Sequence, residues 1–356
     1  MAPNAAAEIV INGRKIGPGQ PVYVIAEMSA NHKQQFERAV KIIEAAKHAG
    51  ADAVKLQTYK PETMTVNVRR DHFRIKGGPW DGKYLYDLYD AAFTPWEWHA
   101  DLKKIANSMG LDWFSTPFDQ TAVDFLETLD VPAYKVASFE NVDLALLQKI
   151  ARTGKPVIVS TGMATLAEMD EAVATLRCGG ANELALLKCC SAYPSTPEEM
   201  NLRTIRHMSD AFHVPVGLSD HSLEDAVPVA AVSLGACIVE KHLTLSRTES
   251  SADKDFSLEP EEFKRMVRSL RTVEKALGNI SYALSSREKN SHRLRRSLFV
   301  VEDMHAGALF TPQNVRSIRP GCGLHPRYLS AVLGKAAPKK IERGTPMAWD
   351  LIGGPA

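Results

Sequence analysis

Two histidines, His221 and His242, are spaced in a way that indicates metal chemistry. Each ends a β-rich run, VPVGLSDH or CIVEKH, and an apolar segment of helical length separates the two runs. If the runs are neighbouring parallel strands joined by a helix, both imidazoles lie at the same end of the sheet. There they can fill two positions of a divalent cation and leave the others open to water or substrate. The alternative is that each histidine is a structural strand-end residue, as most lone histidines are.

Two lysines occupy strand positions where an uncompensated charge is costly. Lys55 and Lys135 lie inside otherwise apolar runs, so each needs an anionic partner. Glu27 and Glu140 could neutralise them in structural ion pairs; the alternative is a bound anion, held also by nearby hydroxyl groups. These hydroxyl groups belong to Thr116, Ser138, Ser160 and Ser219. With two glutamates for proton transfer, the set predicts a metal-assisted reaction on a phosphorylated or carboxylated substrate.

The elements that must position these residues alternate regularly along the chain. Eight β-rich runs are each followed by a helical pattern, and the runs are residues 22–32, 53–59, 112–118, 133–138, 156–162, 184–190, 214–221 and 237–244. Eight such units in about 255 residues predict a TIM barrel, an α/β fold whose chemistry lies at the C-terminal strand ends. Those ends also carry Gln57, Ser191 and Tyr193. A doubly wound open sheet is the alternative, but no G-x-G-x-x-G follows the first run.

Two segments stand outside this alternation. Residues 8–18 alternate apolar and polar around Asn12-Gly13, which predicts a β-hairpin before the barrel. Residues 60–92 are too long and too aromatic for a simple turn, so we expect a lid or substrate loop over the barrel mouth.

The regular pattern ends after Gly278. We expect a barrel domain over residues 1–280, a linker over 281–294 and a small β-rich domain over 295–356. The linker is basic, which is typical of a solvated segment; nucleic-acid binding is the alternative, but interleaved aromatic residues are lacking. A domain of about 55 residues is marginal alone, so it must lean on the barrel or on another subunit.

Composition indicates an ordinary globular protein. A net charge of +1, 45% hydrophobic and 24% charged residues give no reason to expect a nucleic acid or a membrane as the main partner. The five cysteines include no C-x-x-C pair, which favours reduced thiols. We therefore expect a cytoplasmic protein, since neither a signal peptide nor a run of roughly 18 apolar residues is recognisable.

A series of ordered motifs also carries a family resemblance along nearly the whole chain. The motifs are IAEMSANH, VKLQTY, FSTPFD, YKVASFE, VSTGMA, KCCSAYP, GLSDHS, VEKHLT, FSLEP, RRSLFV and RPGCGLHP. They resemble the sialic acid synthase family, which condenses phosphoenolpyruvate with an amino-sugar aldehyde to give a nonulosonic acid and phosphate. The resemblance implies a TIM barrel followed by a small antifreeze-like (SAF) domain, and a homodimer in which this domain covers the partner's active site.

The matching motifs imply a role for each candidate residue. Phosphoenolpyruvate and the reacting sugar end would be surrounded by Glu27, Lys55, Thr116, Lys135, Ser138, Glu140, Ser160 and Ser219. His221 and His242 would hold Mn²⁺ or Mg²⁺. Tyr193 and Asp253 would contact the acceptor sugar, and Arg319 would reach in from the other subunit.

Within the family, the segments EMS, YDLYDAAFTPWEWH and KCCSAYP look more like pseudaminic acid synthases than N-acetylneuraminate synthases. Ser191 stands where the latter usually have Asn, which fits a 6-deoxy, diacetamido acceptor. Lys33-Gln34 and Cys190 depart from both groups. A N-acetylneuraminate or legionaminate synthase, another metal-dependent barrel lyase or aldolase, and a non-catalytic sugar-binding or ice-binding protein remain the alternatives.

Overall fold

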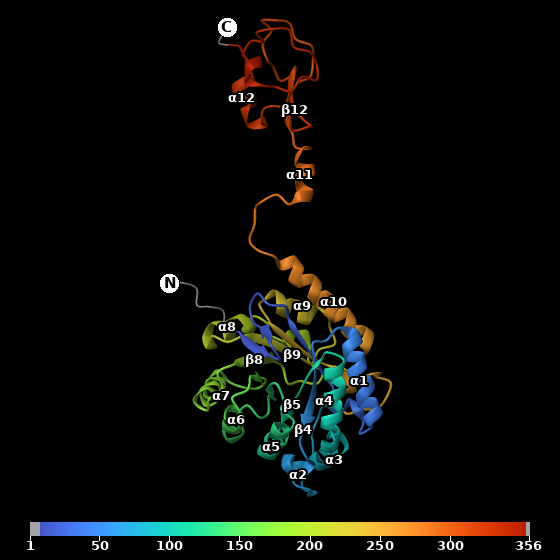
Figure 1. Cartoon of the computed structure of the whole chain (residues 1–356). Helices are drawn as coiled ribbons and strands as arrows, with labels where there is room; N and C mark the ends of the chain where they lie inside the picture. The colour runs from blue at the N-terminus through green and yellow to red at the C-terminus, as the bar shows by residue number, and fades with distance from the viewer. Residues whose placement is uncertain (1–7, 354–356) are drawn as a thin grey trace. The chain divides into compact units, whose positions relative to one another are not determined.

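The computed structural model describes residues 8–353, in two units of which one ends at Gly278 and the other begins at Asn279 (Figure 1). The first unit is a closed barrel of eight parallel strands in the order β10-β3-β4-β5-β6-β7-β8-β9. The strands are β3 (Tyr23–Glu27), β4 (Ala53–Thr58), β5 (Asp112–Pro117), β6 (Tyr134–Val136), β7 (Val157–Ser160), β8 (Leu184–Cys189), β9 (Val216–Asp220) and β10 (Ile238–His242). The predicted TIM barrel is confirmed. The open-sheet alternative is wrong, because β10 pairs with β3 from Ile238↔Tyr23 to His242↔Glu27.

Helices surround the barrel because each presents an apolar face to the strands. They are α1 (Phe36–Ala49), α4 (His99–Ser108), α5 (Gln120–Thr128), α6 (Leu144–Ala151), α7 (Leu166–Cys178), α8 (Thr204–Phe212), α9 (Ala226–Ser233) and α10 (Pro260–Leu277). In α10, Phe263, Met266, Val267 and Leu270 follow helical spacing and are all buried. A capping box and Pro260 at its first position begin this helix.

Strand alternation divides the barrel interior into an apolar layer and a polar layer. The apolar layer is at the N-terminal end of the strands and contains Tyr23, Ile25, Ala53, Phe114, Ala133, Ile158, Ala185, Leu187 and Ile238. The antiparallel pair β1 (Ile9–Ile11) and β2 (Arg14–Ile16) adds Ile9, Ile11 and Ile16 to the same cluster. Both residues of the Asn12-Gly13 turn have positive φ, as a tight hairpin requires. The hairpin therefore packs on the interior layer at the end of the barrel opposite the C-terminal strand ends.

The long connection after β4 is folded and attached to other loops. It contains α2 (Pro61–Met64), a 3₁₀ turn at Asp71–Phe73 and α3 (Leu85–Ala92). Trp80 Nε1 donates to the carbonyl of Ala252 at 2.9 Å, and Gln34 Nε2 donates to the carbonyl of Asp90 at 2.7 Å. These bonds hold the segment against the loops that follow β10 and β3.

The second unit has its own small core. An antiparallel pair, β11 (Ser297–Val300) and β12 (Val315–Ile318), is followed by α12 (Leu329–Val332), and Leu298, Val300 and Phe310 are among the buried residues. An exposed helix, α11 (Ser286–His292), lies within the segment expected to be a linker.

Two further findings concern the described part of the chain. Among residues 8–353, no helix combines the length and the apolar character needed to cross a bilayer. All five cysteines are free thiols.

Candidate active site

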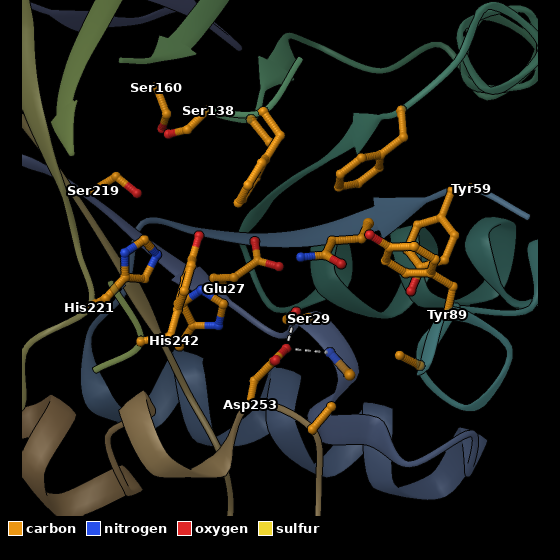
Figure 2. A pocket seen from close by; sticks show the side chains of 18 of the residues that line it. Glu27, Ser29, Tyr59, Tyr89, Ser138, Ser160, Ser219, His221, His242 and Asp253 are labelled. Carbon is orange, nitrogen blue, oxygen red and sulfur yellow. Dashed lines mark hydrogen bonds between the residues drawn. The ribbon is translucent and has the colours of Figure 1, made fainter. Parts of the chain in front are cut away.

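A cavity of about 470 Å³ opens at the C-terminal ends of the barrel strands (Figure 2). Side chains at alternate strand positions point into the barrel, so the polar residues two apart on β4, β9 and β10 share this cavity. The predicted site residues that line it are Glu27, Lys55, Gln57, Lys135, Ser138, Glu140, Ser160, Tyr193, Ser219, His221, His242 and Asp253. Thr116 and Ser191 lie behind the lining, and Arg319 belongs to the second unit.

The two lysines share a carboxylate that sequence reasoning had given no role. Lys55 Nζ is 2.6 Å from Glu27 Oε2 and 3.5 Å from Glu240 Oε1, and Lys135 Nζ is 3.7 Å from the same Glu240 oxygen. Lys135 therefore faces Glu240, whereas the sequence suggested Glu27 and Glu140 as the partners of the two lysines. One signal was available: Glu240 precedes His242 by two residues and so shares its strand face.

This cluster leaves buried carboxylate oxygens without hydrogen-bond partners. All four side chains are buried, yet Glu27 Oε1 and Glu240 Oε2 accept no hydrogen bond. Unsatisfied buried oxygens of this kind are costly and are usually found where a ligand, an ion or water completes the site. The lysine–glutamate set is thus only partly paired and can accept a further group.

Burial separates the protonation states of these carboxylates. Burial raises the pKa of Glu27 to about 7, with Lys55 opposing and Glu240 reinforcing the shift. Burial acts on Glu240 in the same direction, but the charges of Lys135 and Lys55 outweigh it and lower its pKa. Burial also raises the pKa of Glu140 to about 7. Glu27 and Glu140 can therefore each take up or release a proton near neutral pH, whereas Glu240 stays ionised.

Hydroxyl groups fix the lysine ammonium groups. Lys55 Nζ donates to Thr116 Oγ1 at 3.1 Å, and Lys135 Nζ donates to Ser160 Oγ at 2.6 Å. Ser219 Oγ donates to Glu240 Oε1 at 3.3 Å. Thr116 thus acts on the cavity through Lys55 and does not line it.

Gly162 lets two further serines approach one another. Its backbone N–H donates to Ser138 Oγ at 3.1 Å, and a Cβ at this position would lie 2.2 Å from Ser191 Oγ. Any side chain at Gly162 would displace both hydroxyl groups. Ser191 therefore lies close to Ser138, although it does not line the cavity.

The two imidazoles are close together and oriented by the protein. Their ring centroids are 5.3 Å apart, and the ring of Phe256 packs edge-on against both. His221 Nδ1 donates to the carbonyl of Cys190 at 2.8 Å, which leaves Nε2 as the free lone pair. His242 is buried, and its Nδ1 has no hydrogen-bond partner.

These imidazoles fit a divalent cation with open positions. An unpartnered buried nitrogen beside a second, oriented imidazole is the donor set that such an ion uses. Within residues 8–353, no group of three or more His, Cys, Asp and Glu side chains gathers in metal-binding geometry. The protein would thus supply two nitrogens, and water or substrate would supply the rest.

The part of the lining beside the imidazoles is held by the loops after β3 and β10. Asp253 Oδ2 accepts from Ser29 Oγ and, at 3.3 Å, from the backbone N–H of Ala30 (Figure 2). Tyr193 lies with its ring 4.5 Å from that of His221 and 5.6 Å from that of Trp80. Ser29 and Trp80 also line the cavity, and the sequence reasoning had missed both.

Arg319 directly follows β12 and is exposed on the second unit. Its predicted role in the partner's site stays a prediction.

Comparisons with known proteins identify the family of this chain. The NeuB family profile matches residues 42–282, and the SAF domain profile matches residues 295–352. A pseudaminic acid synthase of Campylobacter jejuni subsp. jejuni serotype O:23/36 (strain 81-176) is 45% identical over 91% of this chain and 94% of its own. One of Helicobacter pylori (strain ATCC 700392 / 26695) is 42% identical over 94% and 98%.

A solved structure is similar as well. The N-acetylneuraminic acid synthetase of Leptospira borgpetersenii serovar Hardjo-bovis, crystallised with citrate, superposes with a TM-score of 0.72 at 30% identity, over 80% of this chain and 95% of its own. The resemblance to sialic acid synthases is therefore confirmed: the chain belongs to the NeuB family and carries a SAF domain after its barrel.

Proposed function

We propose that this chain is a pseudaminic acid synthase, which condenses phosphoenolpyruvate with 2,4-diacetamido-2,4,6-trideoxy-L-altrose and water to give pseudaminic acid and phosphate. The observation that carries the proposal is the cavity floor, where two buried lysines and two buried glutamates with free oxygens lie in the same cavity as a pair of imidazoles. The family membership and the names of the relatives agree with it.

The lysines bind the enol phosphate. Lys55 and Lys135 supply ammonium groups in a buried site, and Ser138, Ser160 and Ser219 supply hydroxyl groups beside them. Charge-assisted hydrogen bonds of this kind are strong for phosphate and carboxylate groups. They hold phosphoenolpyruvate while its enol carbon attacks the sugar aldehyde carbon, and they then hold the departing phosphate.

The glutamates transfer protons. Attack by the enol carbon leaves an alkoxide at the former aldehyde carbon, which takes a proton from whichever of Glu27 and Glu140 is protonated, and a cationic carbon at the former enol position, to which water adds. Glu27 or Glu140 takes the proton from this water, because each has a pKa near the working pH. The tetrahedral product then expels phosphate by cleavage of its C–O bond.

His221 and His242 would hold Mn²⁺ or Mg²⁺. Such an ion polarises a carbonyl oxygen and makes its carbon electrophilic. The free Nε2 of His221 and the unpartnered Nδ1 of His242 support this assignment. Metal analysis of the purified chain, expected to give up to one ion per chain, tests it.

An isotope experiment tests the reaction. Phosphoenolpyruvate labelled with ¹⁸O in its bridging oxygen is incubated with the enzyme and the acceptor sugar. Cleavage of the C–O bond sends the label into inorganic phosphate, which mass spectrometry detects. Label retained in the sugar acid contradicts the scheme, and failure to release phosphate with any acetamido sugar contradicts the proposed function.

A homodimer completes the site in this proposal, in the cytoplasm where phosphoenolpyruvate is made. Exposed apolar side chains on the loops after β6 and β7 support an interface there: Phe139 is 58% and Met163 is 60% exposed. Arg319 is exposed on the second unit and available to a partner's site. It supplies a further cation for a carboxylate or a sugar hydroxyl.

Subunit complementation tests the exchange of Arg319. Glu27→Gln and Arg319→Ala are each expected to inactivate a homodimer. In mixed dimers, one site regains both an intact Glu27 and an intact partner arginine, so about a quarter to a half of full phosphate release should return if each site acts alone. Mixtures that stay inactive after subunit exchange would place Arg319 in the site of its own chain.

A further inference from the structure

Helix α3 has an apolar face that does not pack into the protein core. Leu85, Leu88, Tyr89 and Ala92 follow the spacing of one helix face, yet no residue of α3 is buried. All four line the cavity. An apolar face with this spacing normally packs against other apolar groups, and because this one lines the cavity, a bound ligand can serve as its counterpart.

Neighbouring segments extend this face and hold it in place. Met64, Ile75 and Phe118 line the cavity beside it. The ring of Tyr89 packs edge-on against Tyr59 at 5.8 Å. We call these apolar lining residues of α3, together with Met64, Ile75 and Phe118, the α3 wall.

Tyr89 of the α3 wall lies across the cavity from the imidazole of His221. Figure 2 shows Tyr59 and Tyr89 on the side of the cavity away from His221 and Ser219, with Glu27 between them. The aldehyde carbon must react beside the lysines, the glutamates and the imidazoles. The end of the sugar that is remote from its aldehyde therefore extends toward the wall.

We propose that the α3 wall selects acceptors whose remote end carries methyl groups, namely a 6-deoxy carbon and an acetamido methyl, in place of a hydroxyl or a free amine. This inference rests on the proposed function and adds the residues that choose the acceptor. Apolar side chains offer no partner to a hydroxyl group, so a hydroxylated acceptor loses hydrogen bonds to water when it binds.

The test compares two pairs of acceptors with one variant and one matched control. The first pair is 2,4-diacetamido-2,4,6-trideoxy-L-altrose and its 6-hydroxy counterpart; the second differs only in a 4-acetamido or a free 4-amino group. Leu88→Gln changes the wall and keeps helix propensity, and Leu85→Gln is a second wall variant. Val66→Gln is the control, because Val66 is exposed on the same segment and does not line the cavity.

We expect the unmodified enzyme to prefer the methyl-bearing member of each pair by about tenfold or more in kcat/KM for phosphate release. Leu88→Gln should narrow at least one of these kcat/KM ratios by about fivefold. The KM for phosphoenolpyruvate should stay within about twofold of the unmodified value, and this unchanged KM also shows that the fold is intact. Val66→Gln should leave every ratio unchanged.

Two outcomes overturn the inference. If both wall variants still release phosphate and leave the kcat/KM ratios unchanged, the selective role of the α3 wall is refuted, and the proposed function stands. No phosphate release from the unmodified enzyme with any of these acceptor sugars refutes the proposed function and the wall together.

Discussion

Replacing His242 by alanine is expected to remove bound metal and turnover together. The substitution deletes one of the two imidazoles that lie 5.3 Å apart and takes away the unpartnered Nδ1. Because the protein offers two nitrogens there, the loss of one should lower metal affinity and phosphate release by at least about a hundredfold each. Metal content by elemental analysis and phosphate release at saturating Mn²⁺ measure the two effects separately.

His207→Ala is the matched control for this experiment. His207 lies exposed on α8 and does not line the cavity, so its loss should change neither measurement. A His242→Ala enzyme that retained full metal-dependent activity would remove His242 from the site.

Replacing Lys241 by methionine should strongly lower the free energy of unfolding of the protein. Lys241 Nζ lies 2.5 Å from Asp220 Oδ2, and both side chains are 0% exposed. The two residues are partners in the β9–β10 register. Their side chains point outward from the strand ends that carry the histidines. Methionine would leave the Asp220 carboxylate buried without its counter-charge, which costs about 3–5 kcal/mol of unfolding free energy.

Denaturant unfolding at constant pH measures this loss, and a double variant isolates its cause. Asp220→Leu together with Lys241→Met removes both charges at similar volume, so it should recover at least about half of the lost stability. Recovery is not expected to be complete, because Asp220 Oδ1 also accepts from the backbone N–H of Ser222 at 2.8 Å. A loss below about 1 kcal/mol in the single variant would contradict the expected cost of an unpaired buried charge.

The barrel was predictable from the sequence because short stretches of residues are enough to recognise each of its strands and helices. Each strand reads as an apolar run and each helix as a face of regular spacing, so the element order follows from short windows. The polar strand ends were equally visible: Glu27, Lys55 and His242 lie where the parallel-sheet rule puts them, at one rim. The motifs then supported one family along the same stretch.

The pairing of charges inside the barrel was not predictable in this way. Lys135 is on β6 and Glu240 is on β10, and these strands are not neighbours in the sheet. Their contact at 3.7 Å crosses the barrel interior, so it depends on closure and not on adjacent sequence. Thr116 differs from this case, because it lies on β5, the neighbour of β4, and its contact with Lys55 depends on side-chain direction within one paired edge.

The orientation of α3 was also beyond sequence reasoning. Its spacing of apolar residues predicts a helix face but does not distinguish a face packed in the core from one that borders a cavity. The folded connection shows that the face borders a cavity. Trp80 attaches this connection to the loop after β10, and Gln34, on the loop after β3, attaches to it at Asp90.

The N-terminal hairpin closes one end of the barrel, so in the described residues 8–353 the cavity opens at the C-terminal strand ends. Ile9, Ile11 and Ile16 fill its far end, so nothing passes straight through. In the proposed reaction, the ligand of Lys55 would therefore bind before the acceptor sugar, and phosphate would leave through the same opening after the sugar acid.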